Sequence, residues 1–390
     1  MKIVVLGGAG AMGQVIVRDL CESEPVQDVV IADFNRDKAE ELKANLSFPK
    51  LSTSFADIRN TDQLAGVLAG AKTVINSTPY YFNLNVMQAA LAAGCHYLDL
   101  GGLFHVTRRQ LELDKQFREK GLTAVLGMGA APGMTNVMAA HAAESLDRVD
   151  TIDIAIGCVD FVKVEHPMYP PYALDTILDE YTKEPMVFES GQFLAKPPMS
   201  GELAVAFPEP VGTVHAILTL HSEVATLPLS YKDKGIGNVT FRLGLPREFH
   251  DKLKFLVDLG FGNGEALTLD EGPAVPRKVL ASLLERFRQP GGVADDCEVV
   301  RVDVSGECAG RKKLTRLETT VYAHKQWNVS CGALDTGVPP SIVAQMIGAG
   351  TISQRGVLAP ESCVPPEPFF RELSRRLITM RKVTEEYLSS

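Results

Sequence analysis

The sequence lacks the cysteine and histidine spacings that are typical of metal centres and disulfide frameworks. Its seven cysteines are odd in number and scattered along the chain, and neither a C-x-x-C nor an H-E-x-x-H pattern occurs. The sequence also has no internal repeat and no low-complexity segment. We therefore expect neither a disulfide framework nor a metal site.

Basic clusters and membrane-length apolar segments are absent as well. The 390 residues carry a net charge of −9, which argues against nucleic acid and anionic membrane surfaces as partners. No apolar run is long enough to cross a bilayer, and the run after Lys2 is too short for the apolar region of a signal peptide. We expect a cytoplasmic protein, large enough for two domains, that acts on a small molecule.

The residues near the N-terminus predict a dinucleotide-binding turn. An apolar run, residues 3–6, ends in glycines at the G-x-G-x-x-G spacing, and a helical pattern follows at once. Glycine is needed there for a tight turn, for the approach of a pyrophosphate to the backbone, and for close packing of the helix on the strand. The helix N-terminus offers free N–H groups to the phosphates. The expected cofactor contacts in this turn are Gly8, Gly10, Ala11, Met12 and Gly13.

A carboxylate after the second apolar strand indicates which nicotinamide cofactor is bound. Asp33 follows the strand 29–32 and lies 20 residues after Gly13, where dinucleotide folds place the carboxylate that binds the adenosine ribose hydroxyls. This carboxylate would repel a 2′-phosphate, so we expect NAD. Arg36 lies close by and leaves NADP open, and a structural turn that binds nothing is the alternative for the whole motif.

Strands alternate with helical patterns over residues 1–147, which predicts an α/β fold with a doubly wound parallel sheet of the Rossmann type. Such a sheet binds ligands at the carboxyl ends of its strands. Asp57, Ser77 and Thr78 are therefore expected at the cofactor, although Asp57 fits a turn or a helix cap equally well. Tyr80 and Tyr81 are expected at the substrate, or alternatively in the core.

The character of the sequence changes after residue 147. Period-two alternation and proline-rich loops in 148–331 predict a second, α+β domain for substrate binding and oligomerisation. Small-residue helical patterns return in 332–390, including a helical tail over 368–388, so we assign this segment with 1–147 to a discontinuous NAD-binding domain. Expected strands of the second domain are 213–220, 238–244, 298–306 and 315–323, and expected helices are 173–182, 246–258 and 275–288.

Several longer motifs are spread over nearly the whole chain. They are 97–102 (YLDLGG), 127–136 (GMGAAPGMTN), 219–223 (TLHSE), and 337–340 (GVPP) together with 356–361 (GVLAPE). In this order the motifs resemble the saccharopine dehydrogenase-like family, which includes saccharopine reductase, carboxynorspermidine dehydrogenase and L-lysine 6-dehydrogenase. The stretches 172–180 and 221–228 are most similar to the L-lysine 6-dehydrogenase branch.

The resemblance implies roles for individual residues. Gly10, Met12, Asp33, Ser77 and Thr78 match cofactor positions, Tyr80 matches a substrate-loop position, and Asp99 matches a carboxylate that touches both cofactor and substrate in the reductases. One departure concerns the segment 174–178, which holds no arginine where saccharopine reductases use one to grip the glutamate half of saccharopine. This departure favours a smaller substrate such as lysine.

The lysine 6-dehydrogenase branch implies NAD-dependent oxidative deamination of the ε-amine of L-lysine. The product is the 6-semialdehyde, which cyclises to 1-piperideine-6-carboxylate, and ammonia is released. Hydride loss needs a free amine, so the site needs a base or a dry pocket. We expect Asp99 near the amine, His221 as base or activator of water, and Glu223 orienting His221 or holding a substrate ammonium, although each also fits a structural role. Further expected substrate contacts are Tyr80, Tyr81, Gly101, His105 and Thr176.

Two other functions stay open beside lysine degradation. One is an imine reductase of the saccharopine or carboxynorspermidine dehydrogenase type, which a substrate-domain arginine placed for a second carboxylate would favour; Arg242, Arg277 and Arg311 are the candidates. The other is an NAD-binding sensor without turnover, which would not need convergent ionisable groups beside the nicotinamide. A homodimer or homotetramer is expected from fold analogy alone.

Overall fold

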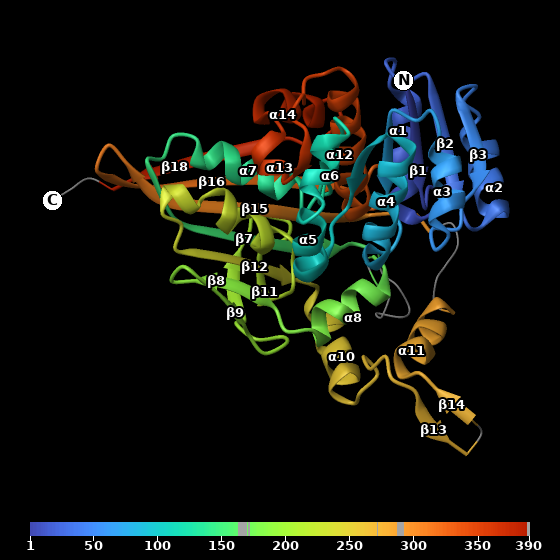
Figure 1. The fold of residues 1–390 in the computed structure, drawn as a ribbon. Helices are drawn as coiled ribbons and strands as arrows, with labels where there is room; N and C mark the ends of the chain where they lie inside the picture. The colour runs from blue at the N-terminus through green and yellow to red at the C-terminus, as the bar shows by residue number, and fades with distance from the viewer. Residues whose placement is uncertain (163–169, 171, 271, 287–291, 388–390) are drawn as a thin grey trace.

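The computed structural model describes residues 1–162, 170, 172–270, 272–286 and 292–387, and two large β-sheets form its framework (Figure 1). In the described chain the first sheet has seven strands, all parallel, in the order β17-β6-β5-β4-β1-β2-β3. The order turns back beside β1, which creates the crevice where open α/β sheets bind ligands. The expected doubly wound α/β fold class is therefore confirmed.

The elements of this half follow the expected alternation. They are β1 (Lys2–Leu6), α1 (Ala11–Glu22), β2 (Asp28–Asp33), α2 (Arg36–Leu46), β3 (Leu51–Phe55), α3 (Thr61–Leu68), β4 (Thr73–Asn76), η1 (Tyr80–Phe82), α4 (Asn83–Ala93), β5 (His96–Asp99), α5 (Leu103–Leu111), α6 (Asp114–Glu119), β6 (Thr123–Val125) and α7 (Met134–Ala143).

Both faces of the first sheet are buried, as a parallel sheet requires. Along β1, Ile3 and Val5 join a core that continues into the second sheet, whereas Val4 and Leu6 join a separate core under α3 and α4. All four side chains are inaccessible to solvent. Because both faces are buried, the strands of this sheet are continuous apolar, β-branched runs in the sequence. These runs are the reason why the strands could be predicted from the sequence pattern.

The second sheet is mixed, and its described strands follow the path β10-β11-β12-β7-β15-β16-β18, with β8 paired to β12 and β9 paired to β8. Its elements are β7 (Arg148–Asp160), α8 (Leu174–Thr182), β8 (Met186–Glu189), β9 (Gln192–Ala195), β10 (Leu203–Ala206), β11 (Thr213–Leu218), α9 (Glu223–Ser230), η2 (Lys232–Lys234), β12 (Asn238–Gly244), α10 (Arg247–Asp258), β13 (Leu267–Leu269), β14 (Gly272–Ala274), α11 (Pro276–Glu285), β15 (Asp296–Cys308) and β16 (Arg311–Tyr322). In Figure 1, α11 and the β13–β14 hairpin extend away from both sheets.

The C-terminal segment contributes to both sheets. Its elements are α12 (Cys331–Gly348), β17 (Gly356–Leu358), α13 (Pro360–Cys363), α14 (Pro366–Ser374) and β18 (Met380–Glu386). Helix α12 packs along α1, where a Cβ atom on Gly337 would lie 2.6 Å from Cβ of Val15. Strand β17 pairs with β6, whereas β18 pairs with β16 in the second sheet.

The expected helical tail over 368–388 is therefore wrong beyond Ser374. The segment is amphipathic, but β18 carries the β-branched pair Val383 and Thr384 and covers the open edge of β16 with an antiparallel ladder. The division into 1–147 with 332–390 and 148–331 stays a prediction, and β18 is the part of the tail that joins the second sheet.

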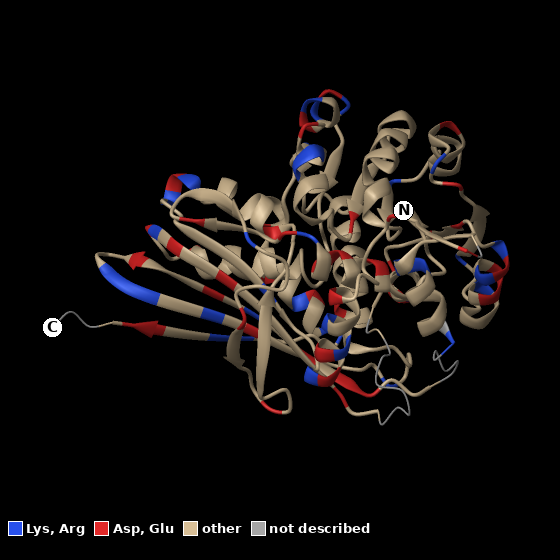
Figure 2. Ribbon diagram, turned by 90° about the horizontal axis from the view of Figure 1, so that it is seen from below, with Lys and Arg blue, Asp and Glu red and all other residues tan. Residues whose placement is uncertain are grey.

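Charges of both signs are distributed over the two halves, as Figure 2 shows. Opposite charges also meet across neighbouring strands of the second sheet. Arg316, for example, holds Asp303 on the adjacent strand at 2.7 Å. None of the described helices is both long and apolar enough to cross a bilayer.

Candidate active site

The glycine turn after β1 has the geometry of a dinucleotide cradle. A Cβ atom on Gly13 would lie 2.2 Å from the carbonyl oxygen of Gly7 and 2.7 Å from Cα of Gly8, so the turn and the first helix touch through bare backbone. Helix α1 begins at Ala11, beside the half-buried Met12, with Gly10 as its N-cap. Its first N–H groups therefore face the crevice, where a pyrophosphate would accept their hydrogen bonds.

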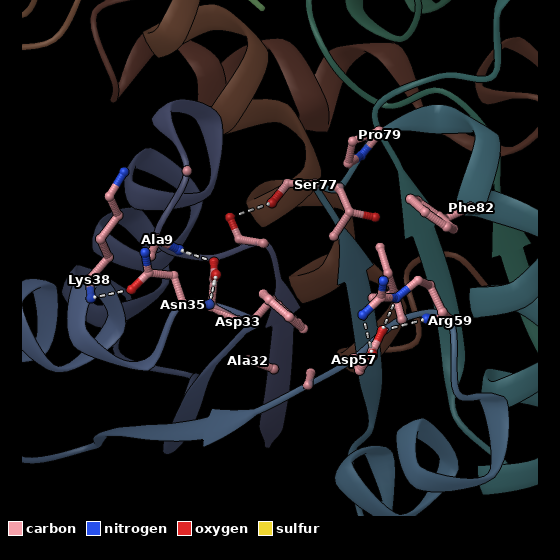
Figure 3. A pocket seen from close by; sticks show the side chains of 16 residues that line it. Ala9, Ala32, Asp33, Asn35, Lys38, Asp57, Arg59, Ser77, Pro79 and Phe82 are labelled. Carbon is pink, nitrogen blue, oxygen red and sulfur yellow. Dashed lines mark hydrogen bonds and ion pairs between the residues drawn. The ribbon is translucent and has the colours of Figure 1, made fainter. Parts of the chain in front are cut away.

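Asp33 lies at the carboxyl end of β2 and lines a cavity of about 520 Å³ beside this turn (Figure 3). Its Oδ2 atom accepts a hydrogen bond from the N–H of Ala9 at 3.1 Å, and Oδ1 accepts one from the N–H of Asn35 at 2.9 Å. Both bonds fix the carboxylate against the glycine turn. Lys38 lines the same cavity, so a cation is available on the side where a 2′-phosphate would be received.

The other expected cofactor residues line this cavity too. Ser77 donates a hydrogen bond to the carbonyl oxygen of Leu6 at 2.7 Å, and Thr78 donates one to Oδ1 of Asn76 at 2.6 Å. Asp57 also lies on the cavity wall, but Arg59 binds both of its oxygens. These hydrogen bonds lower the pKa of Asp57 below its usual range. Asp57 thus lies at the expected cofactor cavity, but its carboxylate is paired with Arg59.

Asp99, at the end of β5, is only 1% exposed, and five donors surround its carboxylate. Oδ1 accepts hydrogen bonds from backbone N–H groups at Gly101 (2.9 Å) and Gly127 (2.6 Å). Oδ2 accepts from Gln110 at 2.6 Å and Tyr97 at 2.8 Å, and from an asparagine amide at 3.2 Å. Burial raises the pKa of Asp99, and the donors oppose that shift.

This arrangement gives Asp99 a clear structural task. Its Oδ1 atom ties the loop after β5 to the loop after β6, because it accepts from both Gly101 and Gly127, which belong to those two loops. A carboxylate with so many donors has no free oxygen for a substrate amine. The expected catalytic role of Asp99 stays a prediction, and the observed contacts favour a positioning role instead.

His221 and Glu223 are brought together with a third residue that the sequence did not single out. Nδ1 of His221 lies 2.7 Å from Oε2 of Glu223, and Nε2 lies 3.7 Å from Oε1 of Glu180 on α8. The ring stacks on Phe241 at 3.6 Å between centroids. Glu180 also accepts a hydrogen bond from Tyr172. All three ionisable groups are buried.

The electrostatic consequence is a histidine that stays charged at neutral pH. Burial by itself would lower the pKa of His221, but the carboxylates of Glu223 and Glu180 outweigh it and raise this pKa to about 9. The imidazole of His221 therefore holds a proton that it can donate at neutral pH, and it becomes a base only at a pH above its pKa.

Three hydrogen bonds fix this cluster at the crevice. Ser222, next to His221, accepts a hydrogen bond from the N–H of Gly102 at 3.2 Å and donates one to the carbonyl oxygen of Leu103 at 2.9 Å. Thr135, after β6, donates a hydrogen bond to Oε1 of Glu223 at 2.9 Å. The histidine thus lies beside the carboxyl ends of β5 and β6, although it belongs to the second sheet's half of the chain.

A second ionisable cluster surrounds Tyr80. The Tyr80 hydroxyl donates a hydrogen bond to Oδ2 of Asp179 at 2.7 Å. Lys183 and Arg277 each approach Asp179 at 3.0 Å, and all three border a cavity of about 480 Å³. Burial opposes ionisation of Asp179, yet these donors hold its pKa below the ordinary value. Of the candidate arginines Arg242, Arg277 and Arg311, it is Arg277 that shares Asp179 with Tyr80, in the loop after β4.

The remaining expected substrate residues differ in placement. Gly101 lies in the β5 loop at a φ of +129°, where a Cβ atom would meet Pro132 at 2.9 Å. Tyr81 is 56% exposed, and His105 is exposed on α5 with its ring against Phe104. Thr176 is half-buried in the first turn of α8. Their substrate roles stay predictions.

Sequence reasoning missed Glu180, Asp179 and Lys183. All three lie on or just after α8, whose first turns contain the buried Ile177 and Leu178. An acidic pair directly after two core residues was the available signal, because an amphipathic helix ordinarily turns acids toward solvent.

Both halves of the chain match models of one protein family. The family model of the saccharopine dehydrogenase NADP binding domain matches residues 3–125, and that of the saccharopine dehydrogenase C-terminal domain matches residues 129–378. Carboxynorspermidine synthase of Vibrio cholerae is 26% identical over 94% of this chain and 93% of its own. Carboxyaminopropylagmatine dehydrogenase of Synechocystis is 24% identical over 96% of this chain and 95% of its own.

Two solved structures share the whole fold. Saccharopine dehydrogenase (L-Glu forming) from Saccharomyces cerevisiae has a TM-score of 0.77 at 18% identity, covering 98% of this chain and 99% of its own. Homospermidine synthase from Legionella pneumophila, in complex with NAD, has a TM-score of 0.66 at 13% identity, covering 98% and 91%. These two matches show the fold, and the match to the NADP binding domain model supports a nicotinamide cofactor. The chain belongs to the saccharopine dehydrogenase family.

Proposed function

We propose that this protein is a nicotinamide-dependent oxidoreductase that reduces the imine formed between an aldehyde and an amine, giving a carboxylated secondary amine. The observation that carries the proposal is the charged His221, held between Glu223 and Glu180 at the crevice. Reduction of an imine consumes one hydride and one proton. A buried imidazolium with a pKa of about 9 supplies that proton at neutral pH.

The proton and the hydride go to different atoms of the same double bond. His221 donates its proton to the imine nitrogen, which makes the adjacent carbon electrophilic. The hydride then adds to this carbon, and the nitrogen keeps the proton and regains its lone pair. Glu223 and Glu180 hold the imidazole in place and stabilise its charged form before the transfer.

A nicotinamide cofactor would supply the hydride, and the residues present fit such a group. The bare-backbone contact at Gly13 and the free N–H groups of α1 suit a pyrophosphate, and Ser77 lines the cavity beside it. Asp33 favours NAD, because its carboxylate would accept hydrogen bonds from ribose hydroxyls and repel a 2′-phosphate. Lys38 keeps NADP as the competing cofactor.

The cluster at Tyr80 supports a carboxylated substrate. Arg277 and Lys183 present two cations to one cavity, and both now share the carboxylate of Asp179. A substrate carboxylate can join these cations as a second anion or exchange with Asp179. Asp179 and Glu180 are consecutive residues of helix α8, so this helix links the cluster at Tyr80 to His221.

The relatives favour imine reduction over lysine deamination. The two curated relatives are named for a carboxylated polyamine and for an aminopropylagmatine, and neither name contains lysine oxidation. The convergence of His221, Glu223 and Glu180 also argues against a sensor without turnover. Oxidative deamination of L-lysine stays a prediction that the resemblance alone supports.

A substrate panel tests the proposal. The protein would be mixed with NAD or NADP and, separately, with carboxynorspermidine, saccharopine or L-lysine, while formation of the reduced cofactor is followed by absorbance. We expect turnover of a carboxylated secondary amine and none of L-lysine. Turnover of L-lysine with release of ammonia would overturn the proposal in favour of lysine 6-dehydrogenation. Cofactor binding without turnover of any of the three would favour the sensor.

A further inference from the structure

A series of buried side-chain hydrogen bonds begins at the wall of the cofactor cavity. Thr78, which lines that cavity, donates to Oδ1 of Asn76 from its hydroxyl at 2.6 Å and from its N–H at 3.2 Å. Asn76 ends β4, and its Nδ2 atom donates to Oδ1 of Asn83, the first residue of α4, at 2.9 Å. Both asparagines are only 1% exposed, so bulk water does not compete for these bonds.

Asn83 continues the series to the loop after β5. Its Nδ2 atom donates to Oδ2 of Asp99 at 3.2 Å and to the carbonyl oxygen of Gly101 at 2.9 Å. Gly101 also donates its own N–H to Asp99 at 2.9 Å, so this residue is held through both of its backbone polar groups. Asn83 thus fixes the loop after β5 relative to the end of β4.

The loop after β5 in turn holds Ser222, the residue next to His221. The Ser222 hydroxyl accepts hydrogen bonds from the N–H of Gly102 at 3.2 Å and from the hydroxyl of Thr107 at 3.0 Å, and it donates to the carbonyl oxygen of Leu103 at 2.9 Å. One donor and two acceptor positions are all that a hydroxyl has. A series of hydrogen bonds, joined through this loop, therefore runs from the cofactor cavity to the residue beside the candidate acid.

The acceptors at the loop after β5 fix the direction of every donor in this series. The Asp99 carboxylate and the Gly101 carbonyl group can only accept, so the Asn83 atom that faces them is the Nδ2 donor. Oδ1 of Asn83 then faces Asn76 and accepts from its Nδ2 atom, which leaves Oδ1 of Asn76 to accept from Thr78. A flipped amide at either asparagine would set acceptor against acceptor, so the series has one arrangement.

The proposed reaction needs the two sides of the crevice in register. The hydride comes from the cofactor side, which the first sheet provides, whereas the proton comes from His221, which the second sheet's half of the chain provides. Both go to adjacent atoms of one double bond. A misplacement of about 1 Å can lower the rate by about 10²-fold. Buried hydrogen bonds between rigid elements are a means of holding such a distance.

We propose that Asn83 is a positioning residue that sets the distance between His221 and the cofactor. This inference rests on the proposed function, because it assigns to Asn83 the alignment of the proton donor with the hydride donor. In this role Asn83 touches neither reactant. Its amide holds the loop after β5, and through that loop Ser222, in place against the cavity wall at Thr78.

Hydrogen exchange of backbone amides, followed by mass spectrometry on the full chain with NAD bound, tests this link without any turnover. In Asn83→Leu the carbonyl oxygen of Gly101 loses its donor, so the loop after β5 is held less firmly. We expect exchange to become about tenfold faster in the peptide 100–107 and also in the peptide 219–224. The peptide 311–322, which covers β16, should exchange as before.

Asn85→Leu is the matched control. Asn85 is half-buried two residues further along α4, where its side chain points to a different side of the helix from that of Asn83. This variant should leave exchange in both peptides unchanged. If Asn83→Leu does not fold, Asn83→Ala removes the same amide without the bulk of leucine and should show the same pattern. Faster exchange in 100–107 but not in 219–224 would overturn the inference, because Asn83 would then hold its own loop only.

Steady-state kinetics tests what the link does for the reaction. Asn83→Leu should lower kcat for imine reduction by about tenfold to a hundredfold and leave KM and the affinity for the cofactor nearly unchanged. In the His221→Gln background the same change should cost little more, because the group that Asn83 aligns is gone. The limb of the pH profile near 9 should stay, since Glu223 and Glu180 are intact. A normal kcat, or an equal loss in both backgrounds, would overturn the inference.

These outcomes are distinguishable from failure of the proposed function. Faster exchange in 219–224 on loss of Asn83, in a protein that reduces no imine, would leave the link standing and remove the reductase. Imine reduction with unchanged exchange in 219–224 would do the reverse. If the unaltered protein oxidises L-lysine instead, the same variants are compared in that reaction, because hydride and proton then leave adjacent atoms of the amine.

Discussion

Nδ1 of His221 lies 2.7 Å from Oε2 of Glu223. Both residues belong to the second sheet's half of the chain, and they lie beside the carboxyl ends of β5 and β6 in the first sheet. Glu223 is completely buried, so its charge is compensated chiefly by this imidazole. In the proposed reaction this pair supplies a proton donor at the crevice without exposing either charge to water. The raised pKa of His221 makes it a proton donor, rather than a base, at neutral pH.

Loss of the imidazole should abolish most of the reduction. In His221→Gln we expect kcat/KM for imine reduction to fall by about 10²- to 10⁴-fold, the usual contribution of general acid catalysis. The measurement is steady-state oxidation of reduced cofactor. His215→Gln is the control, because His215 lies exposed on β11, paired with Glu202, and should retain full activity. Equal losses in both variants would refute the assignment.

The carboxylate partner should set the pH dependence. Glu223 stabilises the charged imidazole, so Glu223→Gln lowers the pKa of His221 from about 9. In the unaltered enzyme, reduction should fall as pH rises through that value, because the acid form is lost, and oxidation of the amine should rise. The variant should show both limbs at lower pH. An unchanged pH profile would mean that His221 is not the titrating group.

Asp33 should control the choice of cofactor. In Asp33→Ser the ribose hydroxyls lose a charged acceptor and a 2′-phosphate loses a repelling neighbour. We expect the ratio of kcat/KM for NAD to that for NADP to fall by about tenfold or more. Asp57→Asn should leave the ratio nearly unchanged, since Arg59 already occupies that carboxylate. A higher activity with NADP in the unaltered protein would contradict the expected NAD preference.

Asp99 should matter for stability more than for proton transfer. Asp99→Asn replaces one acceptor oxygen with an amide that faces existing donors, which leaves buried N–H groups unpaired. We expect the free energy of unfolding to fall by about 2–4 kcal/mol in denaturant titrations. The pH profile of the remaining activity should keep its limb near 9. A normal stability with lost activity would instead support the catalytic role first expected from the sequence.

Arg277 should recognise the carboxylate of the substrate. In Arg277→Gln we expect KM for a carboxylated amine to rise by about tenfold to a hundredfold, as the loss of a charged hydrogen bond implies, with little change in kcat. KM for the same amine without its carboxylate should be unaffected. Arg311→Gln is the control, because Arg311 lies on the exposed start of β16. A rise in KM for both amines would point to a general loss of structure.

The nucleotide-binding half could be predicted because its signals are local. The run 3–6, the glycines and Asp33 lie within one β-α-β unit, so spacing alone placed them. The expected strand 238–244 and helix 173–182 also match β12 and α8 closely, since both have clear periodicity. The structure of the tail after Ser374 could not be predicted in this way, because an amphipathic segment of that length fits either a helix or an edge strand.

The candidate site could be predicted only in part, because its contacts are long-range. His221 and Glu223 were found through a motif, but their partner Glu180 comes from a different helix. The five donors around Asp99 come from two loops, two helices and strand β5 itself, and no spacing in the sequence indicates them. The homodimer or homotetramer and the cytoplasmic location stay predictions.

Transfer of deuterium from labelled reduced cofactor tests the central claim most directly. A carboxylated aldehyde and a primary amine would be incubated with the protein and the labelled cofactor, and the mass of the product would be measured by mass spectrometry. Imine reduction predicts a secondary amine that keeps every nitrogen of the two reactants and carries one deuterium on the carbon of the new C–N bond. Absence of that label, together with release of ammonia when the protein is incubated with L-lysine and the oxidised cofactor, would contradict the account.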